Sequence, residues 1–170
     1  KNFFVCCGLN SIGIGSGGGV GKVTAEWMMT GHINEDIFNY DIKRFQNFHS
    51  KLDFIKSRIT ESLGDLYGMH WPFKQHKTSR NIKTLPHHKN LKSFGACFGV
   101  SGGYERPMWF ALDGEKAEYE YSYNYQNWYP SAEYETNNTV KNVGLFDLTP
   151  FSKFEINSDT AHQELQKICT

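Results

Sequence analysis

The sequence lacks a surplus of charge of either sign, because 18 lysines and arginines are balanced by 18 aspartates and glutamates among 170 residues. Binding to the phosphates of DNA or RNA needs a basic surface, so we expect no nucleic-acid partner. The sequence also lacks an apolar run of about 20 residues, the length that a membrane-spanning helix requires. We therefore expect no membrane segment either.

Cysteine is scarce, and its spacing excludes two common kinds of site. The cysteines are Cys6, Cys7, Cys97 and Cys169. This pattern is typical neither of a zinc site nor of a disulfide framework, and it favours a reducing compartment. Cys6 and Cys7 lie in an apolar run, so we expect them to be small buried residues. His87 and His88 are adjacent in a predicted helix and point in different directions, so we predict no metal site there.

Glycine, by contrast, is concentrated in residues 8–22, GLNSIGIGSGGGVGK. The apolar run Phe3–Cys7 before it predicts a buried strand. The segment after it predicts a helix from about Gly18 to Thr30, with Gly31 as its C-terminal stop. A glycine-rich turn between a strand and a helix lets backbone N–H groups approach an anion or a polar cofactor closely.

Two nucleotide-binding motifs match this stretch incompletely. The dinucleotide motif G-x-G-x-x-G is met by Gly13, Gly15 and Gly18. That motif normally starts where the strand ends, which here is Gly8. The end of a P-loop is matched by Gly21 and Lys22, but Ser16 replaces its first glycine and Val23 its metal-binding hydroxyl. A turn that only packs a helix on a sheet is the structural alternative.

The rest of the chain predicts a mixture of helices and short strands. A 3–4 period of apolar residues predicts a helix over 50–66, with Arg58 and Glu61 on its solvent side. Pro86 is suited to begin a short helix that ends near residue 93. Strands are predicted over 96–100, 118–125, 143–146 and 151–156, and Ser158 or Asp159 is predicted to cap a last helix.

Three charged residues invite a functional reading. Arg44 and Arg106 could bind a substrate carboxylate, but we rank structural roles above that. Arg106, between Glu105 and Pro107, is predicted to anchor an ion pair because arginine is rarely buried unpaired. Asp147 is predicted to stabilise a turn ahead of the Thr-Pro at 149–150.

Three stretches carry a family resemblance: GLNSIGIGSGGGVGK with AEWMMTGH, then YDIKRF, then GGYERPMWF with VGLFDLTPFSKFEI. In this order they resemble the flavin-dependent dimethylglycine and sarcosine dehydrogenases, and also the related regulatory subunit of pyruvate dehydrogenase phosphatase. The resemblance covers essentially the whole chain. It implies an α/β (mixed α+β) internal fragment. Residues 1–31 would end a Rossmann-like FAD-binding oxidoreductase domain, 32–84 would form its central segment, and 85–170 would begin a folate-binding domain like the glycine-cleavage T-protein.

The same resemblance implies a function for the parent protein. It would be a mitochondrial-matrix enzyme that uses FAD to oxidise an N-methylated glycine, dimethylglycine or sarcosine. The one-carbon unit would pass to tetrahydrofolate and the electrons to the electron-transfer flavoprotein. The alternatives are a non-catalytic regulatory subunit of the same architecture and, from the residues alone, a P-loop binding module. The sequence does not decide between the two substrates.

The resemblance also implies a cofactor-contacting segment. The residues expected against the flavin ring are Gly8, Leu9, Asn10, Ser11, Ile12, Gly13 and Ile14. The catalytic residues are expected upstream of Lys1, so the isolated chain is expected neither to bind FAD nor to turn over substrate. We also expect it to expose apolar faces that missing partners would cover, with Trp27, Met28, Phe146 and Phe154 among them.

Overall fold

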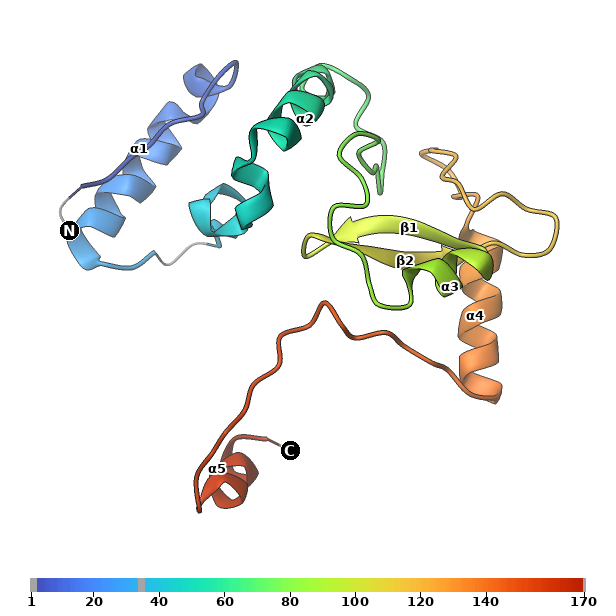
Figure 1. Ribbon diagram of the computed structural model, residues 1–170. Helices are drawn as coiled ribbons and strands as arrows, with labels where there is room; N and C mark the ends of the chain where they lie inside the picture. Colours follow the sequence, from blue (N-terminus) through green and yellow to red (C-terminus); the bar gives the residue numbers. More distant parts are fainter. Residues whose placement is uncertain (1–2, 34–35, 170) are drawn as a thin grey trace. The chain divides into compact units, whose positions relative to one another are not determined.

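The computed structural model describes residues 3–33 and 36–169. It divides into two compact units, Lys1–Asn47 and Phe48–Thr170, which are described separately below (Figure 1). Helices predominate, and the named strands form one small two-stranded sheet. The expectation of a mixed α and β chain is therefore confirmed at this coarse level. Among the described residues, no helix has the length and hydropathy that crossing a bilayer requires.

The first unit is built on helix α1, Gly13–Thr30. Gly31 ends it in the left-handed conformation (φ 77°) and donates its N–H to the Trp27 carbonyl at 2.9 Å, which confirms the predicted stop. The start differs from the prediction, because the helix begins five residues earlier. Its glycines therefore lie inside the helix rather than in a turn, although each costs about 1 kcal/mol relative to alanine.

The predicted strand over Phe3–Cys7 is wrong. These residues are extended but have no strand assignment, and they are exposed, including Cys6 and Cys7. A strand needs a neighbour for its backbone groups, and none pairs with this segment among the residues that the structure describes. The segment runs back along α1 instead (Figure 1), where Phe4 meets Trp27 edge-on with ring centroids 6.0 Å apart.

Three short 3₁₀ helices follow α1: η1 Phe38–Tyr40, η2 Ile42–Arg44 and η3 Asn47–Ser50. Asp41 begins η2 by accepting the Lys43 N–H at 2.8 Å.

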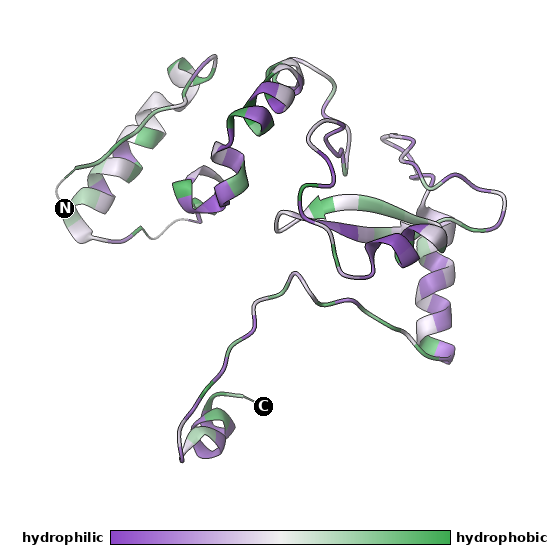
Figure 2. Ribbon diagram, viewed as in Figure 1, coloured by the Kyte–Doolittle hydropathy of each residue, from purple (hydrophilic) through white to green (hydrophobic). Residues whose placement is uncertain are grey.

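Helix α2, Leu52–Asp65, confirms the helix predicted from the 3–4 apolar period. Its apolar and polar residues interleave along the helix in Figure 2. The apolar stripe is exposed, at 42–62 % for each of its members, Leu52, Ile55, Ile59, Leu63 and Leu66. Arg58 and Glu61, predicted to face solvent, are instead half-buried against residues 77–79. The polar side of α2 thus packs on its own unit, and the apolar side faces outward.

The second unit is centred on a hairpin of β1, Ala96–Ser101, and β2, Tyr104–Phe110, which pair antiparallel (Figure 1). Both the predicted strand and the Gly102-Gly103 turn are confirmed. Helix α3, His88–Ser93, contacts β1, and helix α4, Tyr129–Lys141, contacts β2. The buried apolar residues lie at this hairpin: Leu85, Ala96, Cys97 and Trp109.

Helix α4 was not predicted, because its sequence YPSAEYETNNTVK has no apolar period. Tertiary contacts hold it in place. Glu135 Oε1 accepts the Phe110 N–H at 2.8 Å, and Ser131 is fully buried beside Glu115, with Oγ and Oε2 3.3 Å apart. Pro130, in the first turn, supplies a helical φ without needing an N–H partner.

The predicted strands over 118–125, 143–146 and 151–156 are wrong, since none has a strand assignment. In the first of these segments, only some of the alternating tyrosines are half-buried. Tyr119 and Tyr121 are half-buried and stack with ring centroids 5.7 Å apart, whereas Tyr123 and Tyr125 are exposed. Helix α5, Ala161–Ile168, begins after Thr160 without a side-chain cap. Neither predicted cap is correct, although the Ser158 hydroxyl accepts the Thr160 N–H at 3.2 Å in the preceding turn.

Large apolar side chains are exposed in both units, as expected. Met28 is 57 %, Phe146 68 % and Phe154 89 % exposed. Trp27 differs from the prediction, because it is half-buried against Phe4.

Candidate functional site

The glycine-rich segment forms a turn that leads directly into α1. Gly8 (φ 83°) and Ser11 (φ 66°) adopt left-handed backbone conformations. The Ile12 N–H donates to the Leu9 carbonyl at 3.2 Å, and Ile12 stands at the N-cap of α1. The predicted cofactor segment therefore contains the helix N-terminus itself. Gly13 is its first helical residue.

This helix N-terminus is suited to a negatively charged or electron-rich group. It has no side-chain cap and no acidic residue in its first turn. Its first backbone N–H groups lack intrahelical acceptors, and the helix dipole places about half a positive charge there. Asn10, Ser11 and Ile14 are exposed beside it. The pyrimidine edge of a flavin becomes anionic on reduction, so the residues present fit that part of the cofactor.

The glycines of α1 add an open surface. A Cβ built on Gly15, Gly17, Gly18 or Gly19 would meet no atom within 4 Å, and one on Gly13 would meet only the Leu9 Cβ at 3.5 Å. A flat group can therefore approach this part of the helix backbone without displacing side chains.

The same geometry excludes a P-loop. A P-loop lysine stands at the start of its helix, where it reaches the phosphates. Lys22 lies in the middle of α1, and its Nζ is 3.4 Å from Glu26 Oε1, one turn further on. Both side chains are largely exposed, so this is a surface ion pair.

In the second unit, Glu61 on α2 holds the segment that follows the helix. Its Oε1 accepts the Lys77 N–H at 2.6 Å, and its Oε2 accepts both the N–H and the hydroxyl of Thr78. Burial alone would raise the pKa of Glu61, but these hydrogen bonds outweigh it and lower the pKa to about 2. The carboxylate charge is therefore part of the local structure.

This gives a pH prediction. Because the pKa of Glu61 falls on folding, its stabilising effect is fully present above the ordinary value of 4.5 and is lost as the pH drops towards about 2. Hydrogen exchange of the peptide containing Lys77 and Thr78, corrected for the intrinsic exchange rate, should accelerate over that window. Glu61→Gln should exchange fast already at neutral pH and show no further step. A wild-type-like step in the variant would assign the transition to another group.

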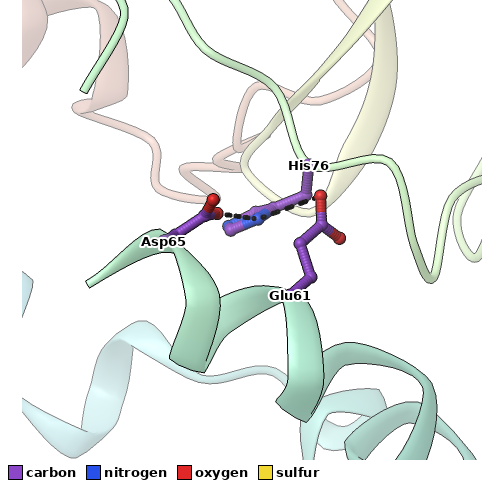
Figure 3. Close-up of side chains that lie close together, drawn as sticks. All are labelled: Glu61, Asp65 and His76. Carbon is purple, nitrogen blue, oxygen red and sulfur yellow. Dashed lines mark ion pairs between the residues drawn. The ribbon is translucent and has the colours of Figure 1, made fainter. Parts of the chain in front are cut away.

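Three potential metal ligands converge beside that contact (Figure 3). Glu61 and Asp65 project from successive turns of α2 towards His76. His76 Nδ1 lies 3.3 Å from Asp65 Oδ2 and 3.9 Å from Glu61 Oε1. The other oxygen of Asp65, Oδ1, is 2.6 Å from Lys74 Nζ. Sequence reasoning missed this cluster. The available signal was the i, i+4 spacing of the two acids on one helix face, but nothing in the sequence placed His76 opposite them.

A buried ion pair joins the same segment to the hairpin. Arg80 Nε donates to Glu105 Oε1 at 2.7 Å, its NH2 group donates to Oε2 at 2.5 Å, and NH2 also reaches the Phe98 carbonyl. Glu105 is 2 % exposed and also accepts the Asn81 N–H at 2.7 Å. Burial would raise the pKa of Glu105, but the hydrogen bonds from Arg80 and Asn81 leave it lowered.

The ion pair corrects one expectation. Glu105 is anchored by Arg80, whereas the neighbouring Arg106 lies over the Phe151 ring at 5.4 Å. Asp147 behaves as predicted, because its Oδ1 accepts the Thr149 N–H at 2.9 Å in a local turn. Hydrogen bonds from the Thr149 side chain and backbone lower the pKa of Asp147.

His88 and Arg44 have local packing contacts. His88 is half-buried, and its ring lies tilted against that of Phe98 with centroids 4.1 Å apart, while His87 is exposed. Arg44 lies over the ring of Phe45 at 4.4 Å.

A small cavity of about 40 Å³ lies in the second unit between η3, α2 and β2. Its walls include Phe48, Phe54, Arg58 and Glu105. This volume accommodates water rather than an amine substrate or a flavin.

Comparison with known proteins relates this geometry to a family. Residues 30–84 match the FAD dependent oxidoreductase central domain, and residues 87–170 match the GCVT N-terminal domain. The whole chain is 40 % identical to 4-methylaminobutanoate oxidase (formaldehyde-forming) of Paenarthrobacter nicotinovorans, of which it covers 21 %. Over 72 % of its length it is 36 % identical to the mitochondrial sarcosine dehydrogenase of Homo sapiens, of which it covers 14 %. The chain therefore carries an FAD dependent oxidoreductase central domain followed by a GCVT N-terminal domain, and its homologues are sarcosine and dimethylglycine dehydrogenases and 4-methylaminobutanoate oxidase.

Another relative has a name that does not describe an oxidoreductase. The chain is 32 % identical, over 98 % of its length, to the mitochondrial pyruvate dehydrogenase phosphatase regulatory subunit of Mus musculus. The chain spans about a fifth of the length of this regulatory subunit and about a fifth of the length of the oxidase.

The boundary between the two domain matches, near residue 85, is crossed by hydrogen bonds of the second unit. Arg80 and Asn81 lie in the part that matches the oxidoreductase central domain, and Glu105 lies in the part that matches the GCVT domain. The Glu105 N–H also donates to the Lys83 carbonyl at 2.8 Å. Sequence reasoning missed Arg80, because an isolated arginine in a polar segment gives no sign of its partner.

Proposed function

We propose that this chain is part of an FAD-dependent dehydrogenase or oxidase that acts on a small N-methylated amino acid. The observation that carries the proposal is the ordered match of the chain to two family domains, together with its similarity to the named amine oxidoreductases. The uncapped N-terminus of α1 within the predicted cofactor segment supports it independently of the comparisons. The proposed substrates are sarcosine, dimethylglycine and 4-methylaminobutanoate, as in the names of the relatives.

In this proposal, residues Gly8–Ile14 contact the pyrimidine edge of the flavin. The flavin supplies the two-electron acceptor chemistry, and the protein supplies position and electrostatic field. The N–H groups at the start of α1 would stabilise negative charge at that edge, an effect worth about 0.3–1 kcal/mol when exposed and up to about 2 kcal/mol when partly buried. Asn10 and Ser11 would add side-chain hydrogen bonds, and the remaining contacts would come from outside this chain.

We further propose that residues 1–31 complete the FAD domain, 32–84 form its central segment and 85–170 begin a folate domain. Transfer of the one-carbon unit to tetrahydrofolate, and of electrons to the electron-transfer flavoprotein, would follow. The relatives with mitochondrial names support placement in the mitochondrial matrix. The exposed apolar stripe of α2 would be covered by the rest of the oxidoreductase domain, since large apolar patches mark interfaces.

A regulatory subunit of pyruvate dehydrogenase phosphatase is the second candidate, favoured by the 32 % identity over nearly the whole chain. The two candidates differ in chemistry. An amine oxidoreductase must transfer electrons from an N-methylated substrate to its flavin, whereas a regulatory subunit has no need to.

The test is anaerobic mixing of the purified full-length protein with each of the three amines. We expect at least one of them to bleach the visible absorbance of the oxidised flavin in a single exponential whose rate saturates with concentration. Glycine, which lacks the N-methyl group, is the matched control and should cause no bleaching. Bound flavin that none of the amines reduces would favour the regulatory candidate.

A further inference from the structure

We propose that Glu61, Asp65 and His76 bind a divalent transition-metal ion of the zinc type. The site would fasten the segment after α2 to the helix. It lies in the second unit and involves none of the residues assigned to the flavin, so it stands apart from the proposed amine oxidation (Figure 3).

The first support is the donor set. Imidazole nitrogen and carboxylate oxygen are both ligands that zinc accepts, and three protein ligands with water in a fourth position make a common open site. The three ligand atoms all lie within 4.8 Å of one another. Ligands about 2.0–2.2 Å from a tetrahedral ion are about 3.3–3.6 Å apart. The His76–Asp65 separation of 3.3 Å meets this spacing, and the His76–Glu61 separation of 3.9 Å needs only a small rotation.

The second support is the direction of the ligands. His76 Nδ1 faces one carboxylate oxygen of Asp65 and one of Glu61, so the three ligand atoms converge on one position. Lys77 and Thr78 fix the Glu61 carboxylate, and Lys74 holds Asp65 Oδ1 so that Oδ2 turns to His76. Such outer hydrogen bonds orient metal ligands in established sites.

A direct hydrogen bond between the His76 ring and Asp65 is the competing explanation of this geometry, and titration with Zn²⁺ distinguishes the two. Isothermal titration of the full-length protein with Zn²⁺ alone would be compared between wild type, His76→Ala and His87→Ala. His76 is partly exposed, so its loss should leave the fold intact, and His87 is an exposed histidine of the same unit. We expect His76→Ala to lose about one equivalent of zinc, or to bind it at least about tenfold more weakly. His87→Ala should match wild type.

A further readout separates a site from general surface binding. Zn²⁺ should slow hydrogen exchange of residues 74–79 in wild type but not in His76→Ala. Identical isotherms for wild type and His76→Ala would overturn the proposal and leave only the contact between His76 and Asp65. Flavin reduction by the amines does not depend on the outcome, so either proposal can fail alone.

Discussion

Replacing Glu105 by alanine should cost about 3–5 kcal/mol of stability in the second unit, because it leaves the half-buried Arg80 guanidinium without its partner. Glu105 accepts hydrogen bonds from Arg80 and Asn81 and is 2 % exposed. The measurement is hydrogen exchange of peptides from β1 and β2 in the full-length protein, which reports the free energy of local opening.

The control is Glu133→Ala, which removes an exposed carboxylate from α4 and should leave exchange unchanged within about 0.5 kcal/mol. A double variant, Arg80→Met with Glu105→Leu, should be more stable than Glu105→Ala, since two apolar groups leave no buried charge. If Glu105→Ala and Glu133→Ala exchange alike, the ion pair contributes little and the apolar residues of the hairpin suffice.

Gly13→Val should impair the proposed flavin site of the full-length protein while leaving α1 folded. Gly13 has a helical backbone, and a Cβ there meets only Leu9 at an ordinary contact distance, so the substitution has room in the chain itself. Valine also has a slightly better helix propensity than glycine. Weaker flavin binding by this variant would then mean that the cofactor approaches Gly13 closely. We expect flavin binding to weaken at least about tenfold, or about 1.4 kcal/mol.

The matched control for this prediction is Gly19→Val, a change of the same size within the same helix, at a position with nothing within 4 Å. The flavin-to-protein ratio and the rate of flavin reduction by substrate would be measured for both variants. The rate of flavin reduction is needed because a covalently attached flavin would stay on the protein even if its contacts were weakened. Equal values for Gly13→Val, Gly19→Val and wild type would mean that the flavin lies elsewhere and that the glycines serve only helix packing.

The elements that the sequence predicted well are those with a local signal. The 3–4 period over Leu52–Leu66 specifies a helix without reference to the rest of the fold, and Gly31 ends α1 because only glycine readily adopts its positive φ. The strand β1 and the Gly102-Gly103 turn form a hairpin whose two strands are neighbours in the sequence.

The errors arise where structure depends on distant partners. The segment Phe3–Cys7 has the composition of a strand but lacks a neighbour among the described residues, whereas α4 has no apolar period and is fixed by Glu135 and Ser131. The cluster of Glu61, Asp65 and His76 was missed for the same reason, because the face of α2 that meets His76 depends on the path of the chain after Asp65. Predicted flavin contacts at Gly8–Ile14 came from family resemblance, and the structure adds that a helix begins among them.

The ion pair between Arg80 and Glu105 limits where this chain can be divided or joined to another protein. The part that matches the GCVT N-terminal domain, if excised near residue 85, would carry Glu105 without Arg80 and Asn81 and so would hold a buried carboxylate without its partners. A chimaera that exchanges the two parts near residue 85 would have the same defect if its first part lacked an arginine at the position of Arg80. A junction placed before Phe48, where the second compact unit begins, would keep Arg80 and Glu105 in the same piece. The domains recognised from the sequence therefore differ from the unit that holds this ion pair together.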